Sequence, residues 1–203
     1  MGTAKITVYK WREIMKVCGS VTSNYENDNP ALRFIALCFN RHIAGEHFAY
    51  GSNGFQISRV TFYCDAGSIP WQFNLLIPPM KTPSGTRWVE FHINEEEKEY
   101  DIAFIDDDDD IISAVRSPFT DAVPLDYESF FKKTHENFDQ YNHGEGKYYI
   151  AVNPKYLLSA LEGFKSCDNV ILNFGSHVQP FIIRPGDDSM NSEAMILPVR
   201  KQW

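Results

Sequence analysis

Hydrophobic and polar residues follow one another along this chain in an order that predicts three similar successions of strands and helices. The last third shows the pattern most clearly, because Tyr148 to Val152 is β-branched and aromatic, and Asn153-Pro154 supplies a capping side chain and a preset φ for a helix. Four apolar residues at helical spacing form one stripe after it: Leu157, Leu158, Leu161 and Phe164. Three strand-like runs come next: Asn169 to Phe174, Val178 to Ile183 and Ala194 to Val199. The pattern predicts a βαβββ unit.

The start of the chain predicts the same order of elements. Residues Lys5 to Tyr9 alternate as a strand, and apolar residues between Trp11 and Cys18 then repeat at helical spacing. Three strand candidates follow: Leu32 to Asn40, Glu46 to Tyr50 and Gln56 to Tyr63. A turn at Gly51-Ser52-Asn53-Gly54 separates the last two candidates. A second βαβββ unit is therefore expected here.

The middle of the chain predicts a third, imperfect copy. Phe73 to Ile77 reads as a strand, but prolines follow it at Pro78, Pro79 and Pro83. Proline removes a backbone donor and clashes with the preceding helical turn, so we expect a loop in place of the helix. Strands resume in three runs: Arg87 to Ile93, Tyr100 to Ile105 and Ile111 to Arg116.

These units suggest a division of the chain into three parts. Residues 1–126 would form one domain of two units, the second with a degraded helix. Residues 127–146 are polar and glycine-containing and are expected to be a linker with a short helix at Tyr127 to Phe138. Residues 147–203 would form the carboxy-terminal half of a second domain.

Several motifs in the last unit carry a resemblance to a known family. In order, they are Val152-Asn153-Pro154-Lys155-Tyr156-Leu157-Leu158, Asp168-Asn169-Val170, Val178-Gln179-Pro180-Phe181-Ile182-Ile183-Arg184-Pro185 and Met195-Ile196-Leu197-Pro198-Val199-Arg200. Together they resemble the carboxy-terminal end of the bacterial replicative sliding clamp, the beta subunit of DNA polymerase III. The turn from Tyr50 to Ser58 is loosely similar to the family's Thr-Asp-Gly turn, with Ser52, Asn53 and Gln56 at the positions of Thr, Asp and Arg. Val123 to Tyr127 is similar to the Phe-Pro-Asp-Tyr region that closes a clamp domain.

The resemblance implies an α+β, DNA-clamp-like fold, in which repeated βαβββ units have antiparallel sheets and place their helices on one face. It implies a non-enzymatic processivity factor or docking platform for a DNA polymerase in replication or repair. A ring of this family contains twelve units, so three units per chain would require a homo-oligomer of four chains. The alternative is a monomeric protein-binding module derived from a clamp, of phage or mobile-element origin, which binds clamp-binding peptides without encircling DNA.

The resemblance also implies a peptide-binding groove. In the family, short tails of polymerases and clamp loaders insert apolar side chains between the Thr-Asp-Gly turn and the carboxy-terminal strands. One wall would comprise Ser52, Gly54, Phe55, Gln56 and Ile57. The other would comprise Val178, Pro180, Met195, Leu197, Pro198, Val199 and Arg200. An apolar cleft with a flexible methionine suits an extended peptide, but the same residues could equally be strand residues packed in a core.

A surface facing double-stranded DNA would use basic residues of the first and last helices. These residues are Lys10, Arg12, Lys16, Lys155 and Lys165. A clamp that slides needs non-specific attraction to phosphates and no contacts with bases. Glu13 and Glu162 dilute the positive charge, and exposed lysines on helices often serve only solubility, so both interpretations stand.

The overall charge and the acidic runs add little to this hypothesis. The net charge of −8 argues against a protein that coats nucleic acid over its whole surface. Clamps are themselves acidic overall, so the charge is neutral evidence for the resemblance. The run Asp106 to Asp110 lacks the alternating carboxylates and the glycine of a calcium loop and is expected to be a solvated hairpin tip, with Glu95 to Glu97 as the tip of the preceding hairpin.

The remaining residue types favour a non-catalytic protein without cofactor or metal. The four cysteines are widely separated, which favours buried free thiols: Cys18, Cys38, Cys64 and Cys167. The six histidines have no metal-ligand spacing, and we find no phosphate-binding loop or nucleophile elbow. No apolar run of about 18 residues and no leader pattern is present, so a cytoplasmic location without membrane contact is expected.

Overall fold

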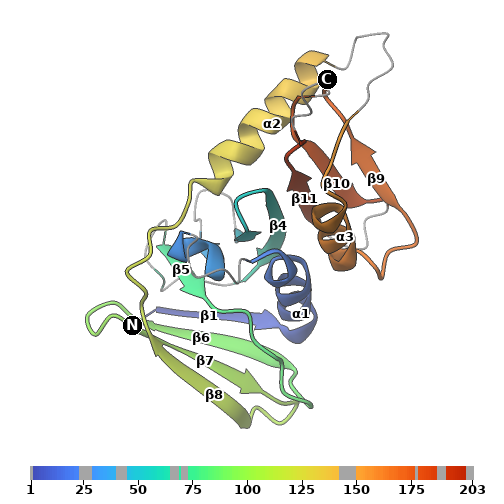
Figure 1. The fold of residues 1–203 in the computed structure, drawn as a ribbon. Coiled ribbons are helices and arrows are strands. Elements are labelled where there is room, and N and C mark those ends of the chain that lie inside the picture. Colours follow the sequence, from blue (N-terminus) through green and yellow to red (C-terminus); the bar gives the residue numbers. More distant parts are fainter. Residues whose placement is uncertain are drawn as a thin grey trace.

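The computed structural model describes residues 2–22, 29–39, 45–64, 69, 73–141, 150–176, 178–186 and 191–199. The elements in chain order are β1 (Gly2–Thr7), α1 (Val8–Val17), η1 (Gly19–Val21), η2 (Pro30–Arg33), β2 (Ile35–Phe39), β3 (Glu46–Ser52), β4 (Gln56–Tyr63), β5 (Phe73–Ile77), β6 (Trp88–Asn94), β7 (Glu99–Ile105), β8 (Ile111–Pro118), α2 (Tyr127–Tyr141), α3 (Pro154–Gly163), β9 (Val170–Asn173), β10 (Phe181–Pro185) and β11 (Ser192–Ile196). Figure 1 shows β1, β6, β7 and β8 at one end of the molecule and β9 to β11 at the other.

Two antiparallel sheets organise these elements. One has four strands in the order β1-β6-β7-β8, and the other has seven in the order β5-β2-β3-β4-β11-β10-β9. β1 therefore leaves its own unit to join the strands of the second unit, while β5 leaves the second unit to join the first. β11 of the last unit pairs with β4 of the first, so one continuous sheet joins the first and last units.

The main core lies between the two sheets and beneath α1. Trp11 of α1 is fully buried, and its ring centroid lies 5.8 Å from that of Phe91 on β6 and 5.9 Å from that of Phe104 on β7. β3 approaches the end of α1 so closely that position 51 requires glycine. A Cβ on Gly51 of β3 would lie 2.0 Å from the carbonyl oxygen of Cys18. Burial of large aromatic side chains is the main stabilising contribution in such a core.

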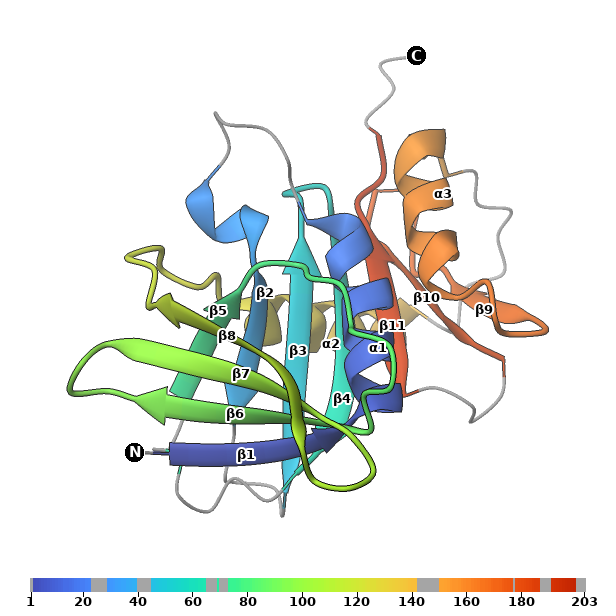
Figure 2. The same ribbon diagram turned by 90° about the horizontal axis from the view of Figure 1, so that it is seen from below.

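A second, smaller core lies on the opposite face of the seven-stranded sheet. Successive residues of β2 point to opposite faces, so Ile35 and Leu37 join the main core while Ala36 joins the second. Helix α2 covers this face with Tyr127 and Phe131, both fully buried. The expected helix at Tyr127 to Phe138 is therefore present, but it packs on the face opposite α1 and α3 (Figure 2).

Several predicted boundaries differ from the observed ones for identifiable reasons. The strand expected at Lys5 to Tyr9 ends at Thr7, because the Thr7 hydroxyl accepts a hydrogen bond from the Lys10 N–H and caps α1. Pro30 begins a 3₁₀ turn, so the strand expected from Leu32 begins at Ile35 instead. The predicted strands at Gln56 to Tyr63 and Phe73 to Ile77 are confirmed.

Two further expectations, a loop after β5 and a strand before α3, have different outcomes. The proline-containing segment 78–87 contains no helix, as predicted. The strand expected at Tyr148 to Val152 falls partly outside the described residues, and its described part, Ile150–Val152, joins neither sheet. The helix after it begins as expected, because the Asn153 side chain accepts a hydrogen bond from the Lys155 N–H and Pro154 occupies the first turn.

Candidate peptide-binding groove and helix face

The turn between β3 and β4 is ordered by its own polar side chains. Asn53 Oδ1 accepts hydrogen bonds from the backbone N–H groups of Phe55 and Gln56, at 3.0 and 3.1 Å. Ser52 Oγ donates to the Gln56 carbonyl at 2.9 Å and accepts from the Gly54 N–H at 3.1 Å. Gly54 has a φ of 86°, which other residues rarely adopt. The turn thus holds Phe55 outward, with 54% of the residue exposed.

The carboxy-terminal strand runs directly beside this turn. Met195 and Ile196 of β11 lie opposite Ile57 and Gln56 of β4, and the Leu197 N–H donates to the Phe55 carbonyl at 3.0 Å. The turn and the β11 part of the other predicted wall are therefore hydrogen-bonded neighbours, whereas Val178 and Pro180 precede β10 and lie in no strand. The structure brings the turn and β11 together although they lie far apart in sequence.

Helix α3 forms the third side of this site. The Tyr156 ring stacks on that of Phe55, with centroids 5.1 Å apart and an interplanar angle of 11°. Gln56 Nε2 donates to Ser159 Oγ at 3.2 Å, and Ser159 Oγ donates to the Ser20 carbonyl at 3.0 Å. Tyr156 and Ser159 were not among the predicted site residues, because nothing in the sequence pairs them with the turn.

The predicted groove residues that the structure describes differ in exposure. Exposed apolar side chains, which a partner can reach, belong to Phe55, Val178, Leu197 and Val199. Ser52, Gln56 and Met195 are instead buried, while Ile57, Pro180 and Pro198 are half-buried. Arg200 lies outside the described residues.

Met195 does not line a peptide groove. Only 2% of it is exposed, and its Sδ accepts a hydrogen bond from Thr134 Oγ1 of α2 at 3.1 Å. Ile57, its partner across the strands, packs against the same core beneath α2. The expectation for Met195 is wrong, because α2 covers this face of the sheet and the strand pattern does not show it. The surface formed by Phe55, Tyr156, Leu197 and Val199 is called the junction surface below.

The basic residues proposed to face DNA lie on two neighbouring helices. α1 and α3 lie side by side in Figure 2, and a Cβ on Gly163 would lie 3.3 Å from Val17 Cα. Segments 8–17 and 154–165 contain five basic and two acidic residues, a net charge of +3. The structure therefore gathers the predicted residues on one helical layer.

Acidic neighbours neutralise part of this charge. Lys10 Nζ forms an ion pair with Glu13 at 2.6 Å, and Lys165 pairs with Glu162. The Lys165 ammonium group holds the pKa of the exposed Glu162 carboxyl below its ordinary value. Lys16 Nζ donates to Ser166 Oγ at 3.0 Å, while Arg12 and Lys155 are exposed. The helix layer is therefore only weakly cationic.

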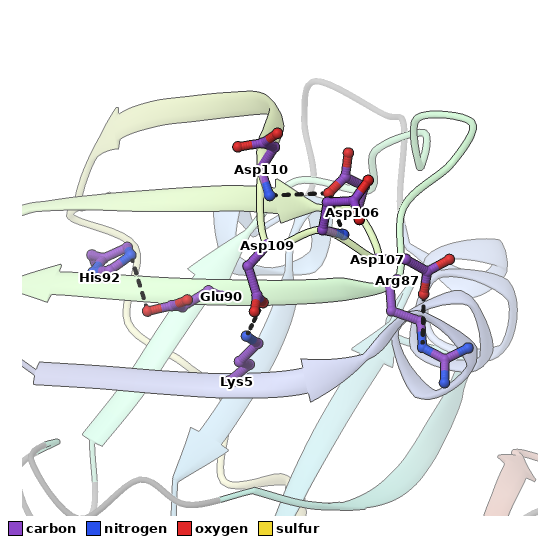
Figure 3. Close-up of polar contacts among 9 residues, drawn as sticks. Lys5, Arg87, Glu90, His92, Asp106, Asp107, Asp109 and Asp110 are labelled. Carbon is purple, nitrogen blue, oxygen red and sulfur yellow. Dashed lines mark hydrogen bonds and ion pairs between the residues drawn. The ribbon is translucent and has the colours of Figure 1, made fainter.

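The five-aspartate run is a hairpin tip, as expected. Asp106 Oδ1 accepts the backbone N–H groups of Asp108 and Asp110, each at 3.0 Å. Figure 3 shows two other aspartates directed at basic residues outside the tip: Lys5 with Asp109 at 3.4 Å and Arg87 with Asp107 at 3.5 Å. Among the residues that the structure describes, no group of three or more His, Cys, Asp or Glu could hold a metal ion.

The buried thiols and phenols are poorly suited to chemistry at neutral pH. Burial raises the pKa of the Cys38 thiol to about 12 and that of Cys18 well above its ordinary value. Burial likewise raises the pKa values of Tyr50 and Tyr127. A neutral thiol is a weak nucleophile, so these groups act as core residues. In the described part of the chain, no helix has the length and apolar character to cross a membrane.

Comparisons with known proteins agree with the architecture. No protein-family model and no curated protein sequence matches this chain. Among solved structures, the DNA polymerase beta subunit of Streptococcus pyogenes is similar, with a TM-score of 0.73, 16% identity, and 97% of this chain and 65% of that chain covered. The DNA polymerase III beta subunit of Thermotoga maritima gives a TM-score of 0.69 with 13% identity, covering 100% of this chain and 66% of that one. The sliding clamp of Bacillus subtilis gives 0.67 and 16%, covering 98% and 64%.

These solved structures are longer than the present chain, which matches 64–66% of their length. The likeness extends over nearly all of this chain, including the sheet shared by β4 and β11. The chain has the fold of the bacterial DNA polymerase III beta subunits, the sliding clamps.

Proposed function

We propose that this chain is a sliding-clamp-like docking platform for a DNA polymerase in replication or repair. The observation that supports it most is the junction surface, where the β3–β4 turn, the end of β11 and α3 meet. Exposed aromatic and aliphatic side chains on a rigid scaffold are suited to an apolar peptide, because a few such anchors dominate binding energy. The solved sliding clamps with the same fold lend further support.

Peptide docking on this surface would use two kinds of contact. Phe55, Leu197 and Val199 offer apolar area at 54%, 43% and 47% exposure, respectively. The hydrogen bonds of the turn and the stack on Tyr156 fix the Phe55 ring before a peptide arrives, which lowers the entropy cost of binding. The partner class is an extended peptide with apolar side chains, such as a polymerase or clamp-loader tail.

Retention on DNA would be topological and would require a closed homo-oligomer. The weak positive charge of α1 and α3 supports this role, because diffuse attraction to phosphates allows sliding, whereas tight binding would impede it. A non-catalytic role fits this mechanism, since every proposed step is a binding step.

A peptide-binding experiment tests docking. Fluorescence anisotropy with a labelled polymerase tail peptide would compare Phe55→Ala with Phe130→Ala, because both phenylalanines are 54% exposed and only Phe55 lies on the junction surface. We expect Phe55→Ala to weaken binding at least about 10-fold, as loss of an aromatic anchor does, and Phe130→Ala to have little effect. Equal binding by both variants and the unchanged protein would contradict the assignment.

Retention on a nicked circular DNA tests the clamp role. A closed oligomer should remain on the circle and be lost once the circle is linearised. The alternative, a monomeric peptide-binding module, is favoured by the pairing of Lys10 and Lys165 with glutamates, which weakens the attraction to DNA. A monomer that binds the peptide but ignores both DNA forms would establish that alternative.

A further inference from the structure

The first two units of this chain complete each other by exchanging their first strands. β1 precedes α1 but pairs with β6, over the register Gly2↔Ile93 to Thr7↔Trp88. β5 begins the second unit but pairs with β2, over Ile35↔Ile77 to Phe39↔Phe73. In each case the first strand of one unit covers the edge of the second strand of the other. Neither of these two edges is left open.

The third unit has a second strand without such a cover. By order in its unit, β9 corresponds to β2 and β6, yet it ends the seven-stranded sheet and pairs only with β10 among the described residues. Figure 2 shows β9 at the far end of the sheet. Ile171, Leu172 and Phe174 expose 39%, 42% and 42% of their surface there. An apolar open edge is a template for another strand.

The third unit also has a first-strand segment that covers no edge. Ile150–Val152 precedes α3 as β1 precedes α1, with Asn153 and Thr7 as the corresponding caps. The segment is apolar, and the Ala151 carbonyl accepts a hydrogen bond from the Val199 N–H at 2.7 Å. Successive residues of an extended chain direct their backbone groups to opposite sides, so those of Ile150 and Val152 would point away from Val199.

We propose that the third units of two copies complete each other in the same manner. Ile150–Val152 of one copy would lie beside β9 of the second, and the reverse pairing would form around the same twofold axis. This is an isologous contact, in which each copy donates a strand and accepts one. The partner of the β9 edge is therefore a second copy of this chain.

Charge favours contact through this unit. Residues 147–203 contain six basic and five acidic residues, a net charge of +1. Residues 1–146 contain 13 basic and 22 acidic residues, a net charge of −9. The two sheets also end at β1, β5 and β8, all within the acidic residues 1–146. Of these strands, β8 follows the run Asp106 to Asp110, so pairing two β8 strands would bring two acidic tips together. Two copies repel each other least when they meet through the third unit.

The inference rests on the proposed clamp function, because the dimer would be one arc of the proposed ring. Two copies that exchange their first-strand segments would contain six units. These form three complete domains, one from the first two units of each copy and one from the two third units. A β8 edge would lie at each end of the arc. In such a ring, β9 of one copy and Ile150–Val152 of the second form the dimer contact, while ring closure would require a separate contact at β8.

Molar mass in solution tests the proposal. Light scattering of the unchanged chain at high micromolar concentration should give at least twice the chain mass of 23.3 kDa, because the dimer is also contained in any larger ring. Leu172→Lys, on the β9 edge, should halve the mass because a lysine on an edge opposes pairing. Ile112→Lys is the matched control, since Ile112 is 40% exposed on the edge strand β8, and it should leave the dimer intact.

A second variant tests the backbone contact. The Gly186 N–H donates to the Asn169 carbonyl at 3.1 Å, so Asn169 faces β10 and alternation directs the backbone groups of Leu172 to the open edge. Leu172→Pro removes that donor and should also give a monomer with an unchanged circular dichroism spectrum.

Each outcome decides the question. A monomeric unchanged chain, or a dimer that Ile112→Lys dissociates while Leu172→Lys does not, would overturn the proposed exchange. Failure of the proposed function is distinguishable, because peptide binding depends on Phe55 and is measured separately. A monomer that binds the peptide would overturn the exchange and the ring but leave peptide docking intact, whereas a β9-dependent dimer that binds neither peptide nor DNA would overturn the proposed function and leave the exchange intact.

Discussion

The rings of Phe55 and Tyr156 stack with their centroids 5.1 Å apart, joining the first unit of the chain to the helix of the third. The contact lies where the β3–β4 turn meets the end of β11, so it belongs both to the fold and to the junction surface. Aromatic pairs of this kind contribute about 0.5–1.5 kcal/mol beyond the area that they bury.

A double-mutant cycle should detect this coupling. Phe55→Ala, Tyr156→Ala and the double variant would be unfolded with urea, and we expect an interaction energy of about 0.5–1.5 kcal/mol between the two sites. Phe130→Ala combined with Tyr156→Ala is the control, because Phe130 lies on α2 at the other face of the sheet and should be additive. Additive effects of Phe55→Ala and Tyr156→Ala would show that the stack does not stabilise the fold.

The strand pattern predicted much of the local structure because alternation and helix caps are local signals. Gln56 to Tyr63 and Phe73 to Ile77 are strands with the predicted bounds, and Asn153-Pro154 begins a helix as predicted. Tyr9 was placed in a strand because residues Lys5 to Tyr9 alternate, but the Thr7 hydroxyl caps the helix two residues earlier. A single side-chain hydrogen bond decided that boundary.

The candidate site was harder to predict because it depends on tertiary contacts. Residues of the turn and of β11 were identified through the family resemblance, whereas Tyr156 was missed because only the fold brings it to Phe55. Met195 was assigned to the groove, since a strand pattern does not reveal which face a distant helix covers. The sequence indicated a helix at Tyr127 but carried no signal for the position of that helix over Tyr50. The rings of Tyr127 and Tyr50 stack with their centroids 5.2 Å apart.

The helix α2 should contribute strongly to stability through one face. Phe131 is fully buried, packs 6.0 Å from Tyr50 and lies under the Arg59 guanidinium at 4.8 Å. Phe131→Ala should cost about 3–5 kcal/mol of unfolding free energy, because it removes a buried ring and leaves a cavity. Phe130→Ala, at the exposed neighbouring position, should cost far less. Similar urea midpoints for the two variants would show that α2 does not pack on the sheet in solution.

The pKa of Asp101 should report the contact between β7 and the edge strand β8. Arg116 donates to both Asp101 oxygens, at 2.7 and 3.0 Å, and holds the pKa of that carboxyl below its ordinary value. A depressed pKa stabilises the folded state above the unfolded pKa of about 3.9, and this contribution is lost as the pH falls through the folded value. The contribution should be small, since the pair is largely exposed.

Arg116→Gln should raise the pKa of Asp101 toward its ordinary value. Carboxyl-carbon NMR titration measures this directly, and Arg87→Gln is the control because Arg87 pairs with Asp107 on the hairpin tip. An Asp101 pKa that Arg116→Gln leaves unchanged would contradict the pairing.

Attraction between the helix layer and DNA should increase when Glu162 loses its charge. Glu162→Gln releases Lys165 from its ion pair and raises the net charge of segments 8–17 and 154–165 from +3 to +4. Each additional phosphate neutralised steepens the dependence of log K on log salt by about 0.9, so DNA binding should tighten most at low salt. Glu96→Gln changes the total charge equally on a distant hairpin tip and should have little effect on either quantity. If the two variants changed binding alike across a salt series, the net charge of the chain would control DNA affinity, and α1 and α3 would not be the surface that faces the duplex.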